Sequence, residues 1–393
     1  MEDMKKIVPA NRIGNVQEYY FSVKLKEIAQ MNAQGADVIN LGIGSPDLPP
    51  AKEVTDTLAQ EAANPKAHGY QPYVGIPELR NAWAQWYRRW YNVELDPANE
   101  VLPLIGSKEG IMHISMAFIN EGDAVLVPNP GYPTYSSVSK LVGAKIISYD
   151  LSAENGWQPD FEALEARHAA GEIDLGAVKL MWCNYPNMPT GANGSVELFE
   201  KLVAFGKKYG IIICHDNPYS FILNDNPLSI MSVEGAKDIC IELNSMSKSH
   251  NMPGWRIGMV ASNRQFIEWI LRVKSNMDSG MFRPMQLAAV KALEAPQSWY
   301  REMNKVYQAR KDLARAILEK VGAEVAPEQV GLFLWGKVAG RGVDICDDVL
   351  YKAKVFITPG FIFGSNGENY IRISLCANEQ TLAGALERIN REL

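Results

Sequence analysis

Residues 239–261, ICIELNSMSKSHNMPGWRIGMVA, contain two short apolar runs separated by a polar segment. The runs Ile239–Leu243 and Gly258–Ala261 are apolar almost throughout, which is typical of strands that are covered on both faces. The segment between them holds Lys248 among three serines, and Arg256 between two glycines. The pattern predicts two buried strands with a polar connection at the end of the first.

Short apolar runs recur along the middle of the chain, and helix-length stretches separate them. Further strands are predicted at Val101–Ile105, Ala124–Val127, Lys145–Tyr149, Ala177–Cys183 and Ile211–His215. Helix-length amphipathic stretches lie between strands, for example at Lys108–Ile119, Val196–Tyr209 and Gln265–Val273. This alternation favours an α/β fold with a mostly parallel, seven-stranded sheet.

The two ends of the chain have a different pattern. A helix is expected over residues 15–34, followed by a short apolar run, and the C-terminal part has long helical patterns before two alternating runs. The runs and patterns are Val38–Leu41, Met285–Leu293, Trp299–Val321, Gly331–Val338 and Asn369–Leu375. We expect a large domain at 45–283 and a smaller α+β domain assembled from 1–44 and 284–393.

Composition excludes several classes of protein. The 393 residues are 47% hydrophobic and 21% charged, and the formal net charge is −6, which argues against a nucleic-acid-binding surface. No apolar run approaches the ~18 residues that a membrane span requires. The start, MEDMKKIVPANR, has no apolar segment typical of a secretory signal. We therefore expect a folded cytosolic (cytoplasmic) enzyme with no nucleic-acid or membrane partner.

The cysteines and histidines do not predict a metal site. The five cysteines form no CxxC pair, and the five histidines show no HExxH spacing. The number of cysteines is odd, and Cys183, Cys214 and Cys240 lie inside apolar runs, which favours reduced, buried thiols over disulfides or zinc. We interpret His113, His215 and His250 as structural residues.

Polar or turn-forming residues follow five of the predicted strands. In open α/β sheets, ligands bind beyond the carboxyl ends of the strands. The segments concerned are 106–110, 128–133, 184–191, 215–219 and 244–249. Each alone is compatible with an ordinary loop, but together they predict a binding site at this edge of the sheet.

Ser107 follows Gly106 where a predicted strand leads into a predicted helix. The free N–H groups and the dipole of a helix start favour an anion such as phosphate, although a serine that only caps the helix has the same sequence signature. The chain has no GxxxxGK[ST] segment, and Gly42-Ile43-Gly44 lacks the third glycine of a dinucleotide fingerprint. Neither a nucleotide P-loop nor a Rossmann NAD site is predicted.

Asp216 and Lys248 each end a strand that we expect to be buried. A carboxylate in that position needs a partner, either a protonated heterocyclic nitrogen or the backbone N–H groups of a turn. A partly desolvated lysine can act as a nucleophile toward carbonyl groups, and the alternative is a solvated surface lysine. The neighbouring serines and Arg256 favour the first role for Lys248.

Ser245-Met246-Ser247-Lys248 also matches the SxxK motif of serine β-lactamases and penicillin-binding proteins. Those proteins carry SDN and KTG motifs as well, and neither tripeptide occurs in this chain. Their SxxK motif should open a helix, whereas this one is expected to end a strand. The sequence therefore disfavours a serine β-lactamase or a penicillin-binding protein.

Residues 245–258 resemble the lysine segment of the class I/II aminotransferases, which are pyridoxal phosphate enzymes of fold type I. The resemblance extends, in the family's order, to residues 70–80, 130–135, 216–219 and 370–374 (YQPYVGIPELR, PGYPTY, DNPY and YIRIS). Residues 41–49 and 274–286 look most like the branch that contains LL-diaminopimelate, aspartate and alanine aminotransferases. The resemblance implies the fold type I architecture and pyridoxal 5′-phosphate as the cofactor.

The resemblance also implies roles at the reactive end of the cofactor. Lys248 would bond to the cofactor aldehyde and later move a proton between the substrate Cα and the cofactor. Asp216 would pair with the pyridinium nitrogen, and Tyr219 would hydrogen-bond the ring hydroxyl. Tyr132 would stack on the face of the ring.

Other roles concern the phosphate, the substrate and a second subunit. Residues implied to hold the phosphate are Ser107, Lys108, Ser245 and Arg256. Tyr70 would reach the phosphate in the neighbouring subunit, which implies a homodimer with shared active sites. Arg372 would grip the substrate α-carboxylate as a bidentate fork, and Gly44 would leave room for the substrate.

One residue departs from the family's pattern. The family has Asn immediately before Pro-Thr-Gly, and this chain has Met188, whose thioether cannot donate a hydrogen bond to the ring hydroxyl. Three alternatives for the hydrogen bond to the ring hydroxyl remain. Asn187, which we assign to the cofactor, or Asn184 could donate it, or Tyr219 could bind the hydroxyl alone. A missing donor would raise the pKa of the linkage between Lys248 and the cofactor.

The implied activity is ping-pong transfer of an amino group from an amino acid to a 2-oxo acid, either 2-oxoglutarate or pyruvate. A C–S β-lyase with the same cofactor is an alternative, and a non-catalytic pyridoxal-phosphate-binding interaction protein is another, suggested by Met188. The sequence leaves two roles open for Arg283: it could contact a distal carboxylate of the substrate, or it could form a salt bridge at the dimer interface. The sequence does not identify the amino donor.

Overall fold

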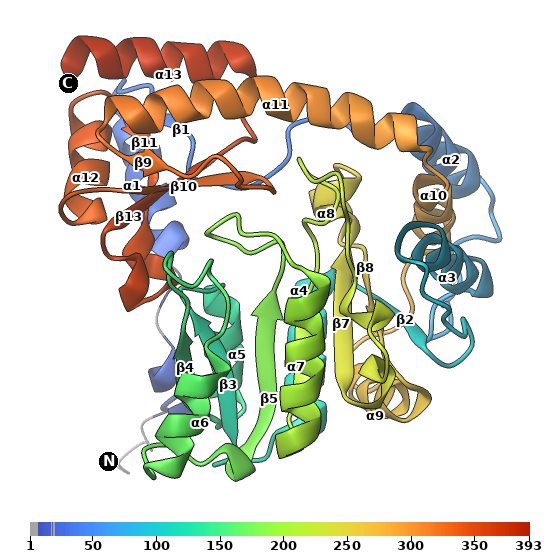
Figure 1. Ribbon diagram of the computed structural model, residues 1–393. Helices are drawn as coiled ribbons and strands as arrows, with labels where there is room; N and C mark the ends of the chain where they lie inside the picture. The colour runs from blue at the N-terminus through green and yellow to red at the C-terminus, as the bar shows by residue number, and fades with distance from the viewer. Residues whose placement is uncertain (1–6, 17, 19) are drawn as a thin grey trace, which may run out of the picture.

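The computed structural model describes residues 7–16, 18 and 20–393; residues 1–6, 17 and 19 of the expected N-terminal arm lie outside the described part. A seven-stranded sheet in the order β2-β8-β7-β6-β5-β3-β4 forms its centre (Figure 1). The strands are β2 Val101–Leu104, β3 Ala124–Asn129, β4 Lys145–Asp150, β5 Val178–Asn184, β6 Ile212–Asp216, β7 Cys240–Ser245 and β8 Gly258–Ala261. Only β8 runs antiparallel to its neighbours, which confirms the mostly parallel α/β sheet.

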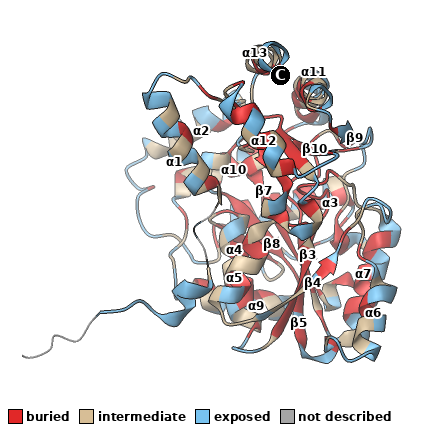
Figure 2. Cartoon of the chain, turned by 90° about the vertical axis from the view of Figure 1, so that its left-hand side faces the viewer, coloured by how far each residue is buried: buried red, intermediate tan, exposed pale blue. Residues whose placement is uncertain are grey.

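Helices cover both faces of this sheet. Figure 2 shows α4 (Ser107–Phe118), α5 (Pro133–Leu141) and α9 (Arg264–Lys274) on one side, and α6 (Phe161–Ala169) and α7 (Val196–Tyr209) on the other. Successive strand residues point to opposite faces, so Val125 and Trp182 belong to one apolar cluster while Leu126 and Met181 belong to the other. Burial on both sides explains why the strands appear in the sequence as continuous apolar runs.

The chain ends build a second unit. Its antiparallel sheet has the order β12-β13-β10-β9, and β1 pairs in parallel with β11, which joins the N-terminal segment to the C-terminal third. The strands are β1 Ile39–Asn40, β9 Glu324–Val325, β10 Phe333–Lys337, β11 Val355–Phe356, β12 Thr358–Pro359 and β13 Tyr370–Ser374. Its helices are α1 Tyr20–Ala33, α11 Gln297–Lys320, α12 Gly342–Tyr351 and α13 Glu379–Glu392.

Three further helices lie beside the β2 edge of the large sheet (Figure 1). They are α2 Lys52–Ala62, α3 Pro77–Tyr91 and α10 Arg283–Leu293. Because α10 packs against α2 and α3, we propose that the large domain continues to the turn between α10 and α11. The boundary at 284 expected from the sequence would divide this group.

Short helical turns complete the described chain. They are α8 Met246–Ser249 and the 3-10 helices η1 Asn11–Asn15, η2 Leu175–Ala177, η3 Ile230–Ser232, η4 Ala236–Asp238, η5 Pro253–Trp255, η6 Gly360–Phe363 and η7 Ser365–Gly367. All five cysteines are buried as free thiols. Among the described helices, none has the length and apolar character needed to cross a membrane.

A buried polar network holds the middle strands of the large sheet together. Glu242 on β7 accepts hydrogen bonds from Tyr87 and Ser229 at 2.7 Å, and its other oxygen lies 2.8 Å from Nδ1 of His215 on β6. The Ile230 N–H also donates to Glu242, at 3.0 Å. His215 is therefore a structural residue, as its sequence context suggests, and Glu242 satisfies polar groups that have no access to water.

We predict that Glu242→Ala lowers the free energy of unfolding by about 3–5 kcal/mol, because the buried donors and His215 lose their shared acceptor. Urea unfolding followed by circular dichroism measures this change. The matched control is Glu268→Ala, which removes an exposed ion pair with Arg264 at 2.8 Å and should change the stability by less than about 1 kcal/mol. Equal effects of the two substitutions would contradict the prediction.

Candidate active site

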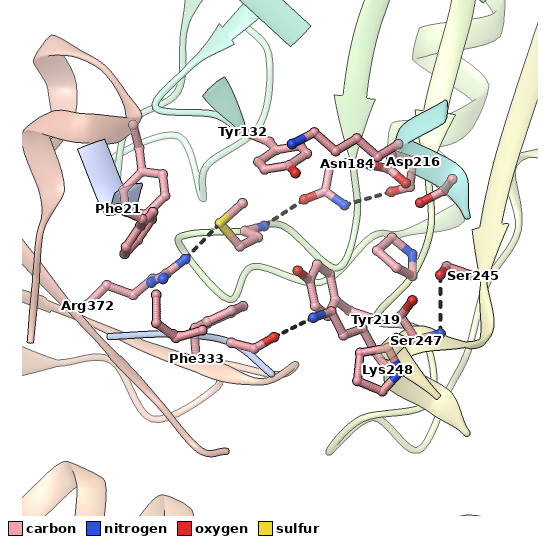
Figure 3. Close-up of a pocket in the computed structure, with 18 of the residues that line it drawn as sticks. Phe21, Tyr132, Asn184, Asp216, Tyr219, Ser245, Ser247, Lys248, Phe333 and Arg372 are labelled. Carbon is pink, nitrogen blue, oxygen red and sulfur yellow. Dashed lines mark hydrogen bonds between the residues drawn. The ribbon is translucent and has the colours of Figure 1, made fainter. Parts of the chain in front are cut away.

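A cavity of about 360 Å3 lies at the carboxyl ends of β5, β6 and β7, facing the small unit (Figure 3). Ten of the twelve residues singled out from the sequence line it. They are Gly44, Ser107, Lys108, Tyr132, Asp216, Tyr219, Ser245, Lys248, Arg256 and Arg372. The other two, Asn187 and Tyr70, do not.

Lys248 stands at the end of β7, on the short helix α8. Ser245 caps this helix by accepting a hydrogen bond from the Ser247 N–H at 3.2 Å. The Lys248 ammonium group donates to the carbonyl oxygen of Gly44. Burial lowers the pKa of Lys248, and the positive charges of Arg372 and Arg256 lower it further.

The helix α8 corrects one argument made from the sequence. Ser245 is the cap of a helix that contains Lys248, so the SxxK segment does open a helix, although a short one. Ser245 does end β7, as expected, but it also starts α8, because a serine cap can begin a helix directly after a strand. The missing SDN and KTG motifs remain the argument against penicillin-type chemistry.

Asp216 is the last residue of β6, and it is buried. Its Oδ2 accepts a hydrogen bond from the hydroxyl of Tyr135 at 2.9 Å, while its Oδ1 has no hydrogen-bond partner among the described residues. Burial raises the pKa of Asp216 to about 6, against the opposing effects of the Tyr135 hydrogen bond and the charge of His215. An unsatisfied carboxylate oxygen at the cavity fits a cationic N–H group of a ligand.

One end of the cavity suits a phosphate. The helix α4 begins at Ser107, after Gly106 in a left-handed conformation with φ of 81°. A side chain at Gly106 would collide with Arg256, since a Cβ there would lie 2.1 Å from Nη2. Burial, with the charge of Arg256, lowers the pKa of Lys108. The helix start and these two cationic side chains favour an anion.

Arg372 lies at the opposite end, on β13, with 3% of its surface exposed. Its guanidinium group donates to the carbonyl oxygen of Gly42 at 2.7 Å and lies 3.2 Å from the sulfur of Met188. Aromatic rings surround it: the Arg372 Cζ lies 3.9 Å from the ring centre of Phe333, 4.7 Å from Phe363 and 5.7 Å from Phe21. This setting suits a carboxylate that enters from the cavity.

Gly44 makes room for a side chain of the protein. A Cβ at Gly44 would lie 2.2 Å from Cζ of Phe333. The absence of a side chain there thus lets Phe333 stand beside Arg372. The resemblance implied space for the substrate, and in the described structure this space is shared with the phenylalanine ring.

Some cavity residues were missed from the sequence. Tyr135 lies three residues after Tyr132 on α5, and this helical spacing could have indicated that both side chains reach the same site. Phe21, Phe333 and Phe363 come from the small unit and carry no local signal, because they are distant in the sequence from the strands of the large sheet.

The residues around Met188 answer part of the question left open by the sequence. Asn187 turns away from the cavity, where its Oδ1 accepts from the Thr190 hydroxyl at 2.8 Å and its amide donates to the carbonyl oxygen of Asn184 at 3.1 Å. Asn184 does line the cavity, but its amide donates to the carbonyl oxygen of Asp216 at 2.6 Å. Because turn hydrogen bonds occupy the Asn187 side chain, we propose that Asn187 does not contact the cofactor.

Two residues expected near a second subunit lie outside the cavity. Tyr70 is 96% exposed. Arg283 forms an ion pair with Glu78 of its own chain at 2.9 Å. The contact of Tyr70 with a partner subunit stays a prediction.

One group of described side chains has the spacing of metal ligands: Glu109, His113 and Asp278. The ammonium group of Lys274 lies 2.6 Å from Asp278 Oδ1 and 3.4 Å from Glu109 Oε1. This buried lysine already supplies positive charge to the carboxylates. We therefore interpret the group as an ionic network between α4 and α9.

Comparisons with known proteins agree on a family. Residues 36–389 match the model of "Aminotransferase class I and II". The chain is 40% identical over 384 residues to an LL-diaminopimelate aminotransferase of Dehalococcoides mccartyi, with 97% of each chain covered. Substrate-bound BacF of Bacillus subtilis superimposes with a TM-score of 0.90 at 34% identity, covering 98% of both chains. An aromatic aminotransferase from Pyrococcus horikoshii superimposes with a TM-score of 0.86 at 26% identity, covering 97% of both chains.

The raised pKa of Asp216 predicts how the stability of the ligand-free protein depends on pH. Because the folded-state pKa of about 6 exceeds the ordinary value of 3.8, ionisation of Asp216 destabilises the fold as the pH rises through this range. Asp216→Asn should match wild type near pH 4 and exceed its free energy of unfolding by up to about 3 kcal/mol at pH 7.

Urea unfolding of both proteins from pH 4 to pH 7, after removal of small molecules by dialysis, measures this difference. Other carboxylates titrate in both proteins, so only the difference between wild type and Asp216→Asn reports on Asp216. A difference that does not change with pH would show that Asp216 ionises at its ordinary pKa.

Proposed function

Because the chain belongs to the class I and II aminotransferases, we propose that it binds pyridoxal phosphate in the cavity between its two units and moves an amino group from an amino acid to a 2-oxo acid. The observation that carries this proposal is the convergence of Lys248, Asp216, Arg256 and Arg372 on one cavity, from three separate segments of the chain.

The residues present fit the cofactor. The unpaired Oδ1 of Asp216 suits the protonated pyridine nitrogen, and the start of α4 with Lys108 and Arg256 suits the phosphate. Tyr132 and Tyr219 both line the cavity, so we assign Tyr132 to stacking on the ring and Tyr219 to the ring hydroxyl. Bound pyridoxal phosphate supplies an aldehyde for a covalent bond to amines and a ring that withdraws electrons.

Lys248 has the properties of the reactive amine and of the proton carrier. Its lowered pKa increases the fraction of neutral amine near pH 7, and only the neutral form is a nucleophile or a base. From its place after β7, Lys248 would move a proton from the substrate Cα to the aldehyde carbon of the cofactor in the first half of the reaction, and in the opposite direction in the second half. Asp216, held by Tyr135, keeps the pyridine nitrogen protonated.

Arg372 binds the α-carboxylate, which both the amino acid and the 2-oxo acid possess. A single carboxylate site for both substrates is consistent with ping-pong exchange, in which the 2-oxo product leaves before the acceptor (2-oxoglutarate or pyruvate) enters. The rings of Phe333 and Phe363 exclude water from the guanidinium group, which strengthens its attraction for the carboxylate.

We further propose a homodimer with shared active sites. Tyr70 supports this proposal, because its side chain is exposed and lies outside the cavity of its own chain. The relatives' names also make LL-diaminopimelate one amino donor to be tested. The similar proteins are named as aminotransferases. We therefore do not propose a C–S β-lyase or a non-catalytic binding protein.

The test of the function follows the absorbance of the yellow holoenzyme when single amino acids are added. Conversion to the amine form of the cofactor indicates transamination, whereas release of pyruvate and ammonia would indicate elimination. We predict that Lys248→Ala slows the conversion at least about 10^4-fold, because the nucleophile and base are both lost. The control Lys305→Ala removes an exposed lysine on α11 and should keep the wild-type rate; unaltered conversion in Lys248→Ala would refute the assignment.

Met188 predicts a shift in the titration of the bound cofactor. Met188→Asn adds a side-chain donor for the ring oxygen, which stabilises the deprotonated form and should lower the pH midpoint of the absorbance titration by about one unit. Met188→Leu adds no donor and should leave the midpoint unchanged. Identical midpoints for wild type and Met188→Asn would show that Tyr219 or Asn184 already replaces the missing donor.

A further inference from the structure

The part of the cavity around Arg372 is lined by apolar side chains. They are Phe21, Ile43, Met188, Phe333 and Phe363, and we call them the apolar wall. Figure 3 shows Phe21 and Phe333 on the two sides of Arg372. The wall is assembled from α1, the segment after β1, the loop after β5, β10 and η6.

The charged groups of the cavity are all assigned to other tasks. Among the described residues that line it, the acidic and basic side chains are Lys108, Asp216, Lys248, Arg256 and Arg372. The first four serve the cofactor in the proposed function, and Arg372 serves the α-carboxylate. The described lining therefore offers no further charge to a side chain of the substrate.

Arg283 does not add a free charge to the cavity of its own chain. Its guanidinium group lies 2.9 Å from a carboxylate oxygen of Glu78, and both side chains are partly exposed. A distal carboxylate could recruit Arg283 from a partner subunit only by competing with this ion pair. Both alternatives left open by the sequence involve a second subunit, so the ion pair within one chain decides neither of them.

Substrate geometry directs the amino acid side chain toward the apolar wall. Its α-carboxylate is bound by Arg372 and its α-amine faces Lys248, so the remaining substituent of Cα must point elsewhere in the same half of the cavity. The thioether of Met188, 3.2 Å from the Arg372 guanidinium nitrogen, adds another apolar group there, where the family has an asparagine. Burying an unpaired charge against such a surface is unfavourable, whereas burying an apolar group is favourable.

We infer, on the basis of the proposed aminotransferase function, that the apolar wall is the subsite for the substrate side chain and that it selects amino acids and 2-oxo acids with apolar side chains. Phenylalanine is preferred over aspartate as the donor, and pyruvate over 2-oxoglutarate as the acceptor. LL-Diaminopimelate, whose far end carries an ammonium and a carboxylate, is also a poorer donor than phenylalanine.

Binding of carboxylates that cannot react tests the subsite without turnover. Isothermal titration calorimetry of the holoenzyme compares 3-phenylpropanoate, which has an apolar end, with butanedioate, which has a second carboxylate. We expect 3-phenylpropanoate to bind at least tenfold more tightly. Equal affinities, or tighter binding of butanedioate, would overturn the inference.

Single-turnover conversion of the holoenzyme compares the donors phenylalanine, aspartate and LL-diaminopimelate. The rate constant at limiting donor should be at least tenfold higher for phenylalanine than for the other two. Ile43→Lys places a cation in the apolar wall, so it should raise the aspartate value and lower the phenylalanine value, each at least tenfold. Met116→Lys adds the same charge to an exposed position on α4, outside the cavity lining, and should retain the wild-type order.

The outcomes separate this inference from the proposed function. Failure of every donor to convert the cofactor would overturn the proposed function, while the order of carboxylate affinities would still report on the subsite. Faster conversion with aspartate or LL-diaminopimelate than with phenylalanine would overturn the inference and leave the aminotransferase function intact. An Ile43→Lys protein with the wild-type order of donors would also overturn it.

Discussion

The burial of ionisable groups at the end of an apolar sheet is the constraint on which the site depends. Asp216 ends β6 with one oxygen bound to Tyr135 and the other without a partner among the described residues. Burial opposes its ionisation, as the raised pKa of about 6 records. Burying a carboxylate oxygen without a partner is unfavourable. A cationic ring nitrogen would supply that partner, so binding of the ligand would be favoured by this unsatisfied oxygen.

The same constraint shapes the rest of the cavity. Lys248 lies at the end of β7 beside Asp216 on β6, because parallel neighbours bring their carboxyl ends to one edge. Its pKa falls for the reason that the pKa of Asp216 rises: both lose water. Arg372, by contrast, is supplied by the small unit, where aromatic rings surround it. The reactive groups and the carboxylate-binding group thus come from different parts of the fold.

The pairing of the two chain ends completes the part of the cavity around Arg372. Pairing of β1 with β11 brings the segment of Gly42 and Gly44 beside β10 and β13. The carbonyl oxygens of these glycines then accept hydrogen bonds from Arg372 and Lys248, and the missing side chain at Gly44 admits Phe333. The apolar wall arises from this assembly, and no single segment contains it.

The sequence by itself determined the seven strands of the large sheet to within two residues. Six of them are covered on both faces and are therefore mostly apolar, whereas the edge strand β4 is largely exposed. Ten of the twelve site residues expected from the sequence line the cavity. Asp216, Lys248 and Arg256 left local signals in the sequence, while most of the others came from the resemblance to the aminotransferase family. Only the tertiary structure decided that Asn187 turns into its own loop, that Tyr135 holds Asp216, and that α10 joins α2 and α3. It alone brought Phe21, Phe333 and Phe363 around Arg372, because these contacts depend on how α1, β10, η6 and β13 pack within the small unit, which leaves no periodic or local trace in the chain.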